Sequence, residues 1–240
     1  LNKSEITRCL FNLEKFKDFL EKVLLGCEIE SWLEVKSKEE MEKWSDRNQG
    51  GDLSLFVRFG RLTGLCKLGK GSGKLLCYEG YESPSRKSFY KEGFFEGEVY
   101  TLDSGKITED HAFSWLGDGK IHPFEGTTEP FIGKEKAYTW SKSPRYSGKI
   151  AEVGSIARMV INKDPLILDL FRNSGSNVYS RTIARLHEVV VLTRKIEEWM
   201  KQIDPDKPFY KKHQEFAVVP KGEGLIEAAR GALGHWIRVK

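Results

Sequence analysis

Arg230 is the residue whose surroundings point most clearly to a chemical role. It follows Ala228 and Ala229 and precedes Gly231, so small residues flank it on both sides. Small neighbours let the backbone approach another group closely, and a guanidinium there offers a fixed fork of hydrogen-bond donors. A solvated surface charge explains this pattern poorly. An ion pair with a buried carboxylate such as Glu227 explains it as well as an active-site role does, and the residues alone do not separate the two.

A glycine-rich segment, residues 64–71, nearly matches a phosphate-binding loop. It has the first glycine, the four-residue gap and the Gly–Lys pair. It lacks the Ser or Thr that would hold Mg²⁺, and it follows a helical pattern where the motif needs a strand. We interpret the segment as a helix end followed by a loop.

Two other groupings could do chemistry but have simpler explanations. His122 and Glu125 stand three residues apart in an irregular segment, and a metal site would need further ligands. Side-chain hydrogen bonds that pin the loop explain the pair better. Ser180, His187 and Asp169 resemble a hydrolase triad only in composition, because no serine here lies in a Gly-x-Ser-x-Gly turn. We reject the triad.

The four cysteines, Cys9, Cys27, Cys66 and Cys77, form no Cys-x-x-Cys pair. Their spacing therefore indicates no cysteine metal site. Small buried hydrophobic residues are the expected reading, with Cys9 on the apolar face of a predicted helix. No metal ligand and no cofactor-binding residue is assigned from the sequence.

Composition excludes two classes of partner. The 240 residues carry 39 Lys+Arg and 35 Asp+Glu, a formal net charge of +4, with the two signs interspersed. Nucleic-acid binding would need clustered basic residues, so we expect none. No apolar run reaches the length of a membrane span, and no targeting signal is visible. The sequence starts at Leu1 and stops within an alternating run, residues 235–240, which indicates a fragment.

Hydrophobic periodicity predicts an α+β fold of long packed helices with inserted β-hairpins and an irregular loop region. We expect one domain over residues 1–240, helical in 1–70, with strands and long loops in 71–150, helical in 151–204, and short strands with a turn in 205–240. The predicted helices are 4–26 with Ser4 as cap and Gly26 as end, 37–48, 52–69 with Asp52 as cap, 152–161, 165–172 and 177–203. The predicted strands are 75–78, 88–102, 216–219 and a strand–turn–strand in 226–240 that follows a turn at 222–224.

Five segments, in order, resemble the large subunit of nickel–iron hydrogenases. Residues 227–237, EAARGALGHWI, are similar to the family's signature EAPRGALGHWI. The other four are HPFEGTTEP (122–130), YTWSKSPRY (138–146), EVGSIARM (152–159) and SRTIAR (180–185). They extend over about half of the chain, so the chain is identified as the central part of such a subunit.

The resemblance implies an oxidoreductase that reversibly oxidises H₂ to protons and electrons. In the family, two Cys-x-x-Cys pairs hold a nickel–iron centre with CO and cyanide ligands, and neither pair is present here. The isolated chain is therefore expected to be inactive and to bind no cofactor. Arg230 matches the arginine that hangs over the metals, which makes it the implied catalytic residue, with Ala229 and Gly231 beside it. A fixed cation there suits anionic cyanides and a developing hydride.

The resemblance also implies partners and a location. The implied partner is the iron–sulfur small subunit, and the implied substrate is H₂. Residues 122–126 and 143–146 are most typical of the membrane-linked uptake class. We therefore expect a periplasmic location, or membrane association through the partner subunit.

Three positions depart from the family pattern. Ala229 and Ser155 each replace a proline, and Phe124 replaces a tryptophan. The missing proline at 229 frees the backbone beside Arg230, which affects the geometry around the implied metal site.

Two alternatives stay open. One is a non-catalytic relative acting as a scaffold, like the quinone-side subunit of respiratory complex I, although the intact Arg230 motif argues against it. The other is a mixed α/β binding module whose aromatic-rich residues 111–146 form a protein interface.

Overall fold

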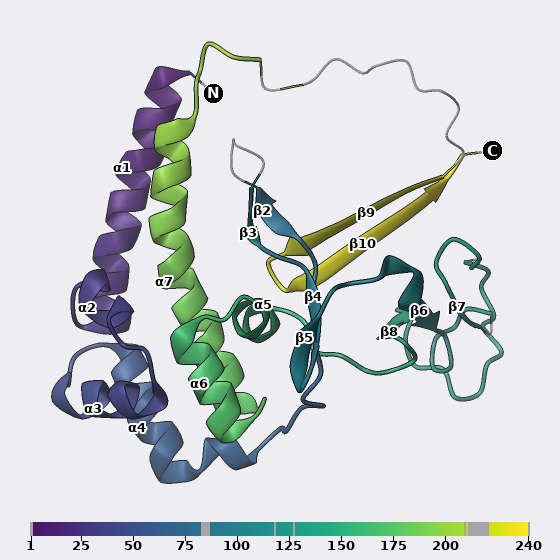
Figure 1. Cartoon of the computed structure of the whole chain (residues 1–240), viewed down its shortest axis with the longest axis horizontal. Coiled ribbons are helices and arrows are strands. Elements are labelled where there is room, and N and C mark those ends of the chain that lie inside the picture. The colour runs from purple at the N-terminus through teal and green to yellow at the C-terminus, as the bar shows by residue number, and fades with distance from the viewer. Residues whose placement is uncertain are drawn as a thin grey trace.

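The computed structural model describes residues 2–82, 87–117, 119–126, 128–208, 210 and 221–239. Helices gather on one side of the molecule, and short strands and loops on the other (Figure 1). The helical elements are α1 (Lys3–Phe19), the π-helical η1 (Leu20–Leu25), α2 (Ile29–Leu33), α3 (Lys38–Arg47), α4 (Asp52–Thr63), the 3₁₀ turns η2 (Leu65–Lys67) and η3 (Ser104–Lys106), α5 (Ser155–Ile161), α6 (Pro165–Ser174) and α7 (Val178–Gln202). The strands are β1 (Leu75–Cys77), β2 (Gly80–Glu82), β3 (Ser88–Tyr90), β4 (Gly93–Glu96), β5 (Glu98–Tyr100), β6 (Ile107–Asp110), β7 (Lys120–Ile121), β8 (Ser143–Tyr146), β9 (Lys221–Ala228) and β10 (Gly231–Arg238). The predicted α+β fold is confirmed; that residues 1–240 form one domain stays a prediction.

α1 begins at a capping box on Asn2, not at Ser4 as predicted. Asn2 Oδ1 accepts a hydrogen bond from the backbone N–H of Glu5 at 2.9 Å, and Glu5 Oε2 accepts one from the N–H of Asn2 at 2.8 Å. Two free N–H groups are satisfied reciprocally, so the helix starts earlier and Ser4 lies inside it. It continues through η1 and ends, as predicted, at Gly26, whose φ is 67°.

Further boundaries differ from the prediction at glycines that take positive φ. Such a backbone conformation interrupts a helix, and glycine adopts it without steric cost. α4 begins at Asp52, which was predicted as its cap, and ends at Gly64 and not at Gly69. α5 begins at Ser155 and not at residue 152.

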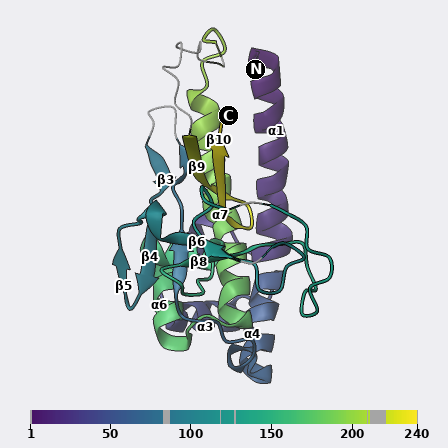
Figure 2. The ribbon, with the colours of Figure 1, turned by 90° about the vertical axis from the view of Figure 1, so that its right-hand side faces the viewer.

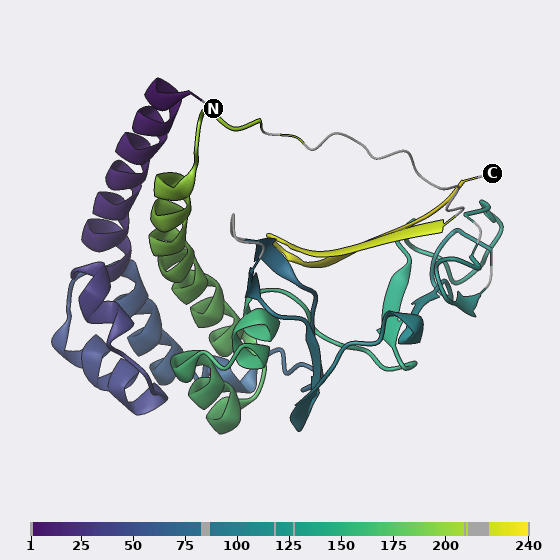
Figure 3. The ribbon, with the colours of Figure 1, turned by 45° about the horizontal axis from the view of Figure 1, so that its top comes forward.

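α7 is the longest helix and lies beside α1 (Figure 3). The predicted helix over 177–203 is present, with Asn177 as its N-cap. Ile183, His187 and Val190 of this helix are buried, and α1, α5 and α6 pack against it. The sequence places Leu186, Val189, Thr193, Ile196, Met200 and Ile203 along one stripe of this helix. The stripe is buried in part: Thr193 is buried and Leu186 and Val189 pack against the core, whereas Ile196 is 41% exposed. Within the described residues, no helix has the length and apolar character needed to cross a membrane.

β1 divides the buried interior into two hydrophobic clusters. Successive side chains of a strand point to opposite faces, so Leu75 and Cys77 pack with the helices, whereas Leu76 packs on the other side with Phe94 and Tyr146. The strand is buried throughout. β1 therefore joins the strand layer to the helices, and α5 packs against it.

The strands form small antiparallel sheets rather than one large sheet. Their orders are β1-β4-β5, β2-β3, β7-β6-β8 and β9-β10. Figure 2 shows the β9-β10 hairpin in front of α7. The predicted strand over 88–102 is divided into β3, β4 and β5, and Gly97, with φ 83°, makes the turn between β4 and β5.

The β9-β10 hairpin is longer than predicted. Gly222 and Gly224 lie within β9, opposite Ile237 and His235, so the predicted turn at 222–224 is wrong. The alternating run in β10 pairs with this part of β9, so the ladder is longer than expected. The turn lies at residues 229–230. The predicted strand at 216–219 lies outside the described residues.

Between β6 and α5, the described residues form the short strands β7 and β8 and otherwise irregular loops, which fits the predicted irregular loop region. Isolated bridges tie it together, for example Ser114 with Thr139. Large apolar side chains remain exposed on it, namely Phe113, Phe131, Ile132, Tyr138 and Trp140. Their role as a protein interface stays a prediction.

Candidate functional site

Arg230 lies in the turn of the β9-β10 hairpin, and this turn sits next to the start of α5 (Figure 1). Ala229 and Arg230 are exposed, whereas Gly231 is buried. The turn closes one side of a cavity of about 560 Å³. The cavity is lined by Val153, Gly154, Ser155, Ile156, Arg181, Arg185, Ala229 and Arg230.

The cavity wall is cationic. Three arginines line it, and no carboxylate does. Arg181 is already occupied, because it donates to Glu152 at 3.1 Å and to the carbonyl of Gly69 at 2.7 Å. Within the described ranges, the side chains of Arg185 and Arg230 make no hydrogen bond or ion pair. Their charge therefore favours an anionic group in this cavity.

The carboxylate nearest to Arg230 in sequence, Glu227, pairs with a different arginine. Arg158 Nη1 donates to Glu227 Oε2 at 2.6 Å, and the backbone N–H of Tyr78 donates to Glu227 Oε1 at 2.7 Å. Burial raises the pKa of Glu227, and these two bonds oppose the rise. The alternative that Glu227 pairs with Arg230 is therefore wrong for this structure.

Arg158 lies at the centre of a buried ion cluster beneath the turn. Its Nε and Nη2 donate to the two oxygens of Glu188 at 2.6 and 2.7 Å, a bidentate pair. The hydroxyl of Ser155 donates to Glu188 Oε2 at 2.5 Å. Ser155, which replaces a proline of the family pattern, therefore takes part in the cluster. Arg158 also reaches the turn, donating to the carbonyls of Ala228 at 2.9 Å and Ala229 at 3.2 Å.

Two glycines let the turn approach α5. Gly154 has φ 94°, and a Cβ there would lie 2.9 Å from the carbonyl oxygen of Arg230. Gly231 has φ 144°, and a Cβ there would lie 2.4 Å from Val153 Cγ2. Both the backbone conformation and the contact exclude a side chain. Of the small residues next to Arg230, Gly231 thus permits a close approach to residues 153–154.

The residues described here do not provide ligands for a metal centre. Within these ranges, no three His, Cys, Asp or Glu side chains come together as a metal site. No cysteine lines the cavity. Cys77 is buried in β1, and burial raises the pKa of its thiol, so it stays protonated. Cys9 is exposed, so the expectation that it is buried is wrong, while Cys27 and Cys66 are half-buried.

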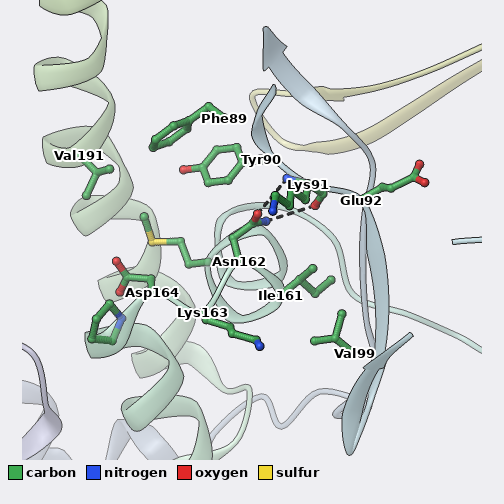
Figure 4. Close-up of a pocket in the computed structure, with 12 residues that line it drawn as sticks. Phe89, Tyr90, Lys91, Glu92, Val99, Ile161, Asn162, Lys163, Asp164 and Val191 are labelled. Carbon is green, nitrogen blue, oxygen red and sulfur yellow. Dashed lines mark hydrogen bonds between the residues drawn. The ribbon is translucent and has the colours of Figure 1, made fainter. Parts of the chain in front are cut away.

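A second cavity, of about 610 Å³, lies at the other end of α5 (Figure 4). Lys91 and Asn162 hold its wall together: the N–H of Lys91 donates to Asn162 Oδ1 at 2.8 Å, and Asn162 Nδ2 donates to the Lys91 carbonyl at 3.2 Å. Its lining mixes apolar side chains with two lysines, a glutamate and an aspartate. Asp164 in this wall is bound by His187 at 3.1 Å, so the acid is engaged in the fold.

The weaker candidates behave as structural residues. Residues 64–68 continue from the end of α4 as a 3₁₀ turn, so the phosphate-loop geometry is absent from this described segment. His122 contacts the carbonyl of Ser104 at 3.3 Å and accepts from the N–H of Phe124 at 3.2 Å, which pins the loop. His187 bonds Asp164 and Trp32 rather than Ser180 or Asp169.

Arg158 and Glu188 were not singled out from the sequence. A signal was present: Arg158 stands between Ala157 and Met159 in a helix whose residues are all buried. A cation that interrupts an apolar run needs a buried acid as a partner. The sequence did not show which acid, because Glu188 lies 30 residues away and Glu227 lies 69 residues away.

The comparisons with known proteins agree on one family. The family model described as nickel-dependent hydrogenase matches residues 31–240. The periplasmic [NiFeSe] hydrogenase large subunit of Desulfomicrobium baculatum is 30% identical over 167 residues, covering 61% of this chain and 32% of the relative. The uptake hydrogenase large subunit of Bradyrhizobium diazoefficiens is 29% identical over 193 residues, covering 60% of this chain and 32% of the relative. The chain thus spans about a third of the length of these relatives.

Solved structures show the same fold. The Ni-Fe-Se hydrogenase from D. vulgaris Hildenborough matches with a TM-score of 0.73 at 24% identity, covering 100% of this chain and 49% of that chain. The [NiFeSe]-hydrogenase of Dm. baculatum matches with a TM-score of 0.75 at 23% identity, covering 100% and 48%. Since the family model matches most of the sequence, this chain belongs to the nickel-dependent hydrogenase family.

Proposed function

We propose that this chain forms part of the large subunit of a nickel–iron hydrogenase, in which Arg230 acts at the active site. The enzyme would reversibly oxidise H₂ to protons and electrons. The observation that carries the proposal is the unpaired Arg230 at the mouth of an acid-free cavity with two further arginines. Family membership gives this cavity its chemical meaning.

The nickel–iron centre, with CO and cyanide ligands, would supply the H₂ chemistry. Its thiolate ligands would come from cysteines that this chain does not contain, since no Cys-x-x-Cys pair is present. Arg230 would contribute a fixed donor fork and a positive charge, which stabilise anionic ligands in a site of low polarity. Ala229 and Gly231 would set how closely the Arg230 backbone approaches that site.

The proposed partner is the iron–sulfur small subunit, because the relatives are named large subunits or large chains. The exposed aromatic side chains of residues 113–140 offer a surface for such a protein contact. The proposed location is the periplasm, or the membrane through the partner. One relative is named periplasmic and another quinone-reactive, which supports both options.

The first test uses the purified 240-residue chain. We expect no stoichiometric nickel by metal analysis and no H₂ uptake with a dye acceptor, because the thiolate ligands are missing. Nickel binding together with H₂ uptake would overturn this assignment of the ligands. The flanking sequence of the parent gene gives a second check: Cys-x-x-Cys on both sides is expected, and its absence would indicate the metal-free scaffold instead.

The second test addresses Arg230 in the full-length enzyme with its partner. Arg230→Lys should lower kcat for H₂ oxidation about 100-fold, since a point charge replaces an oriented fork. Arg194→Lys is the matched control, because Arg194 pairs with Glu30 at the surface at 3.1 Å. Equal activities of the two variants would remove Arg230 from the proposed site.

A further inference from the structure

The hairpin turn that carries Arg230 is hydrogen-bonded to the guanidinium of Arg158. The backbone carbonyls of Ala228 and Ala229 both accept hydrogen bonds from Arg158, at 2.9 and 3.2 Å. These two residues directly precede Arg230. Together with the close contact between Gly154 and the Arg230 carbonyl, these bonds fix the backbone on both sides of the Arg230 Cα.

The guanidinium itself is held rigidly. Three of its five N–H groups bind carboxylate oxygens, two on Glu188 and one on Glu227, and the other two face the turn carbonyls. The side chains of Arg158, Glu188 and Glu227 are exposed by only 1%, 6% and 0%. A planar fork whose donors are all engaged cannot rotate without breaking several charged bonds.

The cluster joins three elements that are distant in sequence. Arg158 comes from α5, Glu188 from α7 and Glu227 from β9. Arg185, one of the cavity arginines, lies on α7 within one turn of Glu188. The cluster therefore sets where the hairpin turn stands relative to the rest of the cavity wall.

From this geometry we infer that Arg158 is a positioning residue for Arg230. Glu188 and Glu227 orient its guanidinium, and the guanidinium orders the turn from which Arg230 enters the cavity. The inference rests on the proposed function for the role of Arg230, but the ordering of the turn is a property of this chain. It can therefore be tested without metals, partner or hydrogenase activity.

The test measures the order of the turn in the folded 240-residue chain. Glu188→Gln keeps the side-chain volume and removes the charge that orients Arg158, and Ser155→Ala is a milder change that removes the hydroxyl bonded to Glu188. The readout is the backbone ¹⁵N order parameter at Ala229, Arg230 and Gly231, with thermal unfolding measured in parallel. Glu197→Gln is the matched control on α7, because Glu197 pairs with Lys17 and Lys201 away from the cluster.

In the wild type and in Glu197→Gln, the three amides should show order parameters near the rigid value of about 0.85. In Glu188→Gln they should fall below about 0.6 while the rest of α5 and α7 stays ordered, with a smaller fall in Ser155→Ala. Unchanged turn order in a folded Glu188→Gln chain would overturn the inference, even if its unfolding temperature drops.

A rescue separates positioning from general stability. Proline at position 229 fixes φ of that residue by covalent means, so it should replace part of the restraint that Arg158 provides. We expect Ala229→Pro to restore turn order in the Glu188→Gln background without restoring the unfolding temperature. Recovery of both, or of neither, would mean that the cluster acts on the whole fold and not on the turn. Failure of the hydrogenase activity tests would leave this result untouched.

Discussion

Arg158 and Glu227 meet at 2.6 Å between α5 and β9, with both side chains almost completely removed from solvent. Glu227 lies two residues before Ala229, near the end of β9. The strand that supplies the acid therefore leads directly into the turn. Stability and site geometry therefore depend on the same contact.

Removing one partner of this cluster should strongly destabilise the chain. Glu227→Ala leaves a buried cation short of one acid, and loss of a buried partner costs about 3–5 kcal/mol. Urea unfolding followed by circular dichroism measures this loss. Glu39→Ala, which removes an exposed acid paired with Lys43, serves as the control and should leave the midpoint unchanged. Similar midpoints for the two variants would contradict the role of the buried pair.

Glycines at the turn should tolerate alanine less well than a glycine that also has positive φ but lies in open space. Gly231→Ala and Gly154→Ala place a Cβ within 3 Å of neighbouring atoms, whereas Gly148, with φ 72°, has nothing within 4 Å of its Cβ position. All three variants strain the backbone, so Gly148→Ala isolates that cost from the contact. Differential scanning calorimetry should show a larger drop in Tm for the two turn variants. An equally large drop in Tm for Gly148→Ala would show that backbone strain, and not the contact of the Cβ, causes the loss of stability.

Asp164 should make stability depend on acid pH. Burial alone would raise the pKa of this carboxyl, but the bonds from His187 and from the N–H of Ile167 hold it below its usual value. A depressed pKa contributes stability that is complete above the unfolded value of about 3.9 and disappears as pH falls through the lower folded value. Asp164→Asn keeps the cap of α6 but removes this titration. The difference in unfolding free energy between wild type and variant should therefore shrink as pH is lowered below about 4.

Two contacts orient the imidazole of His187 against Asp164. Trp32 Nε1 donates to His187 Nδ1 at 3.0 Å, which leaves Nε2 to donate to Asp164 at 3.1 Å. A constant difference in unfolding free energy between pH 2 and pH 6, measured with chemical denaturant, would show that Asp164 has an ordinary pKa.

Thiol labelling should distinguish the cysteines by their placement. Cys9 is exposed on α1, whereas Cys77 is buried and the pKa of its thiol is raised by burial. Since the thiolate is the reactive form, a maleimide should label Cys9 early and Cys77 only on unfolding. Mass spectrometry of digested samples gives the order. Early labelling of Cys77 in the native chain would contradict its burial in β1.

Local signals in the sequence predicted most of the helical elements. Ser37 and Asn177 cap their helices, and Gly26 ends one, because each of these functions depends on side chains or φ values within a few residues. The sequence did not show which side of α7 is fully buried, because α1, α4, α5 and α6 all contact this helix. The predicted turn at 222–224 was wrong, because a glycine inside a β-ladder cannot be told from a glycine in a turn until its partner strand is known.

The candidate site likewise has a part that the sequence shows and a part that only the fold brings together. Arg230 and its small neighbours are contiguous, so their pattern could be recognised. The cluster that supports them brings together Arg158, Glu188 and Glu227 from three elements, and no local pattern encodes that meeting. The cationic cavity likewise exists only once β9-β10 lies against α5 and α7.

The ion cluster also has a consequence for the order of assembly. During synthesis, Arg158 and Glu188 emerge before Glu227, and these two can pair as soon as α5 meets α7. The turn has no anchor until β9 arrives and its carbonyls take the remaining donors. A chain interrupted between residues 188 and 227 would thus contain both members of the Arg158–Glu188 pair and yet lack Ala229 and Arg230, so the cavity wall is complete only after the hairpin has docked.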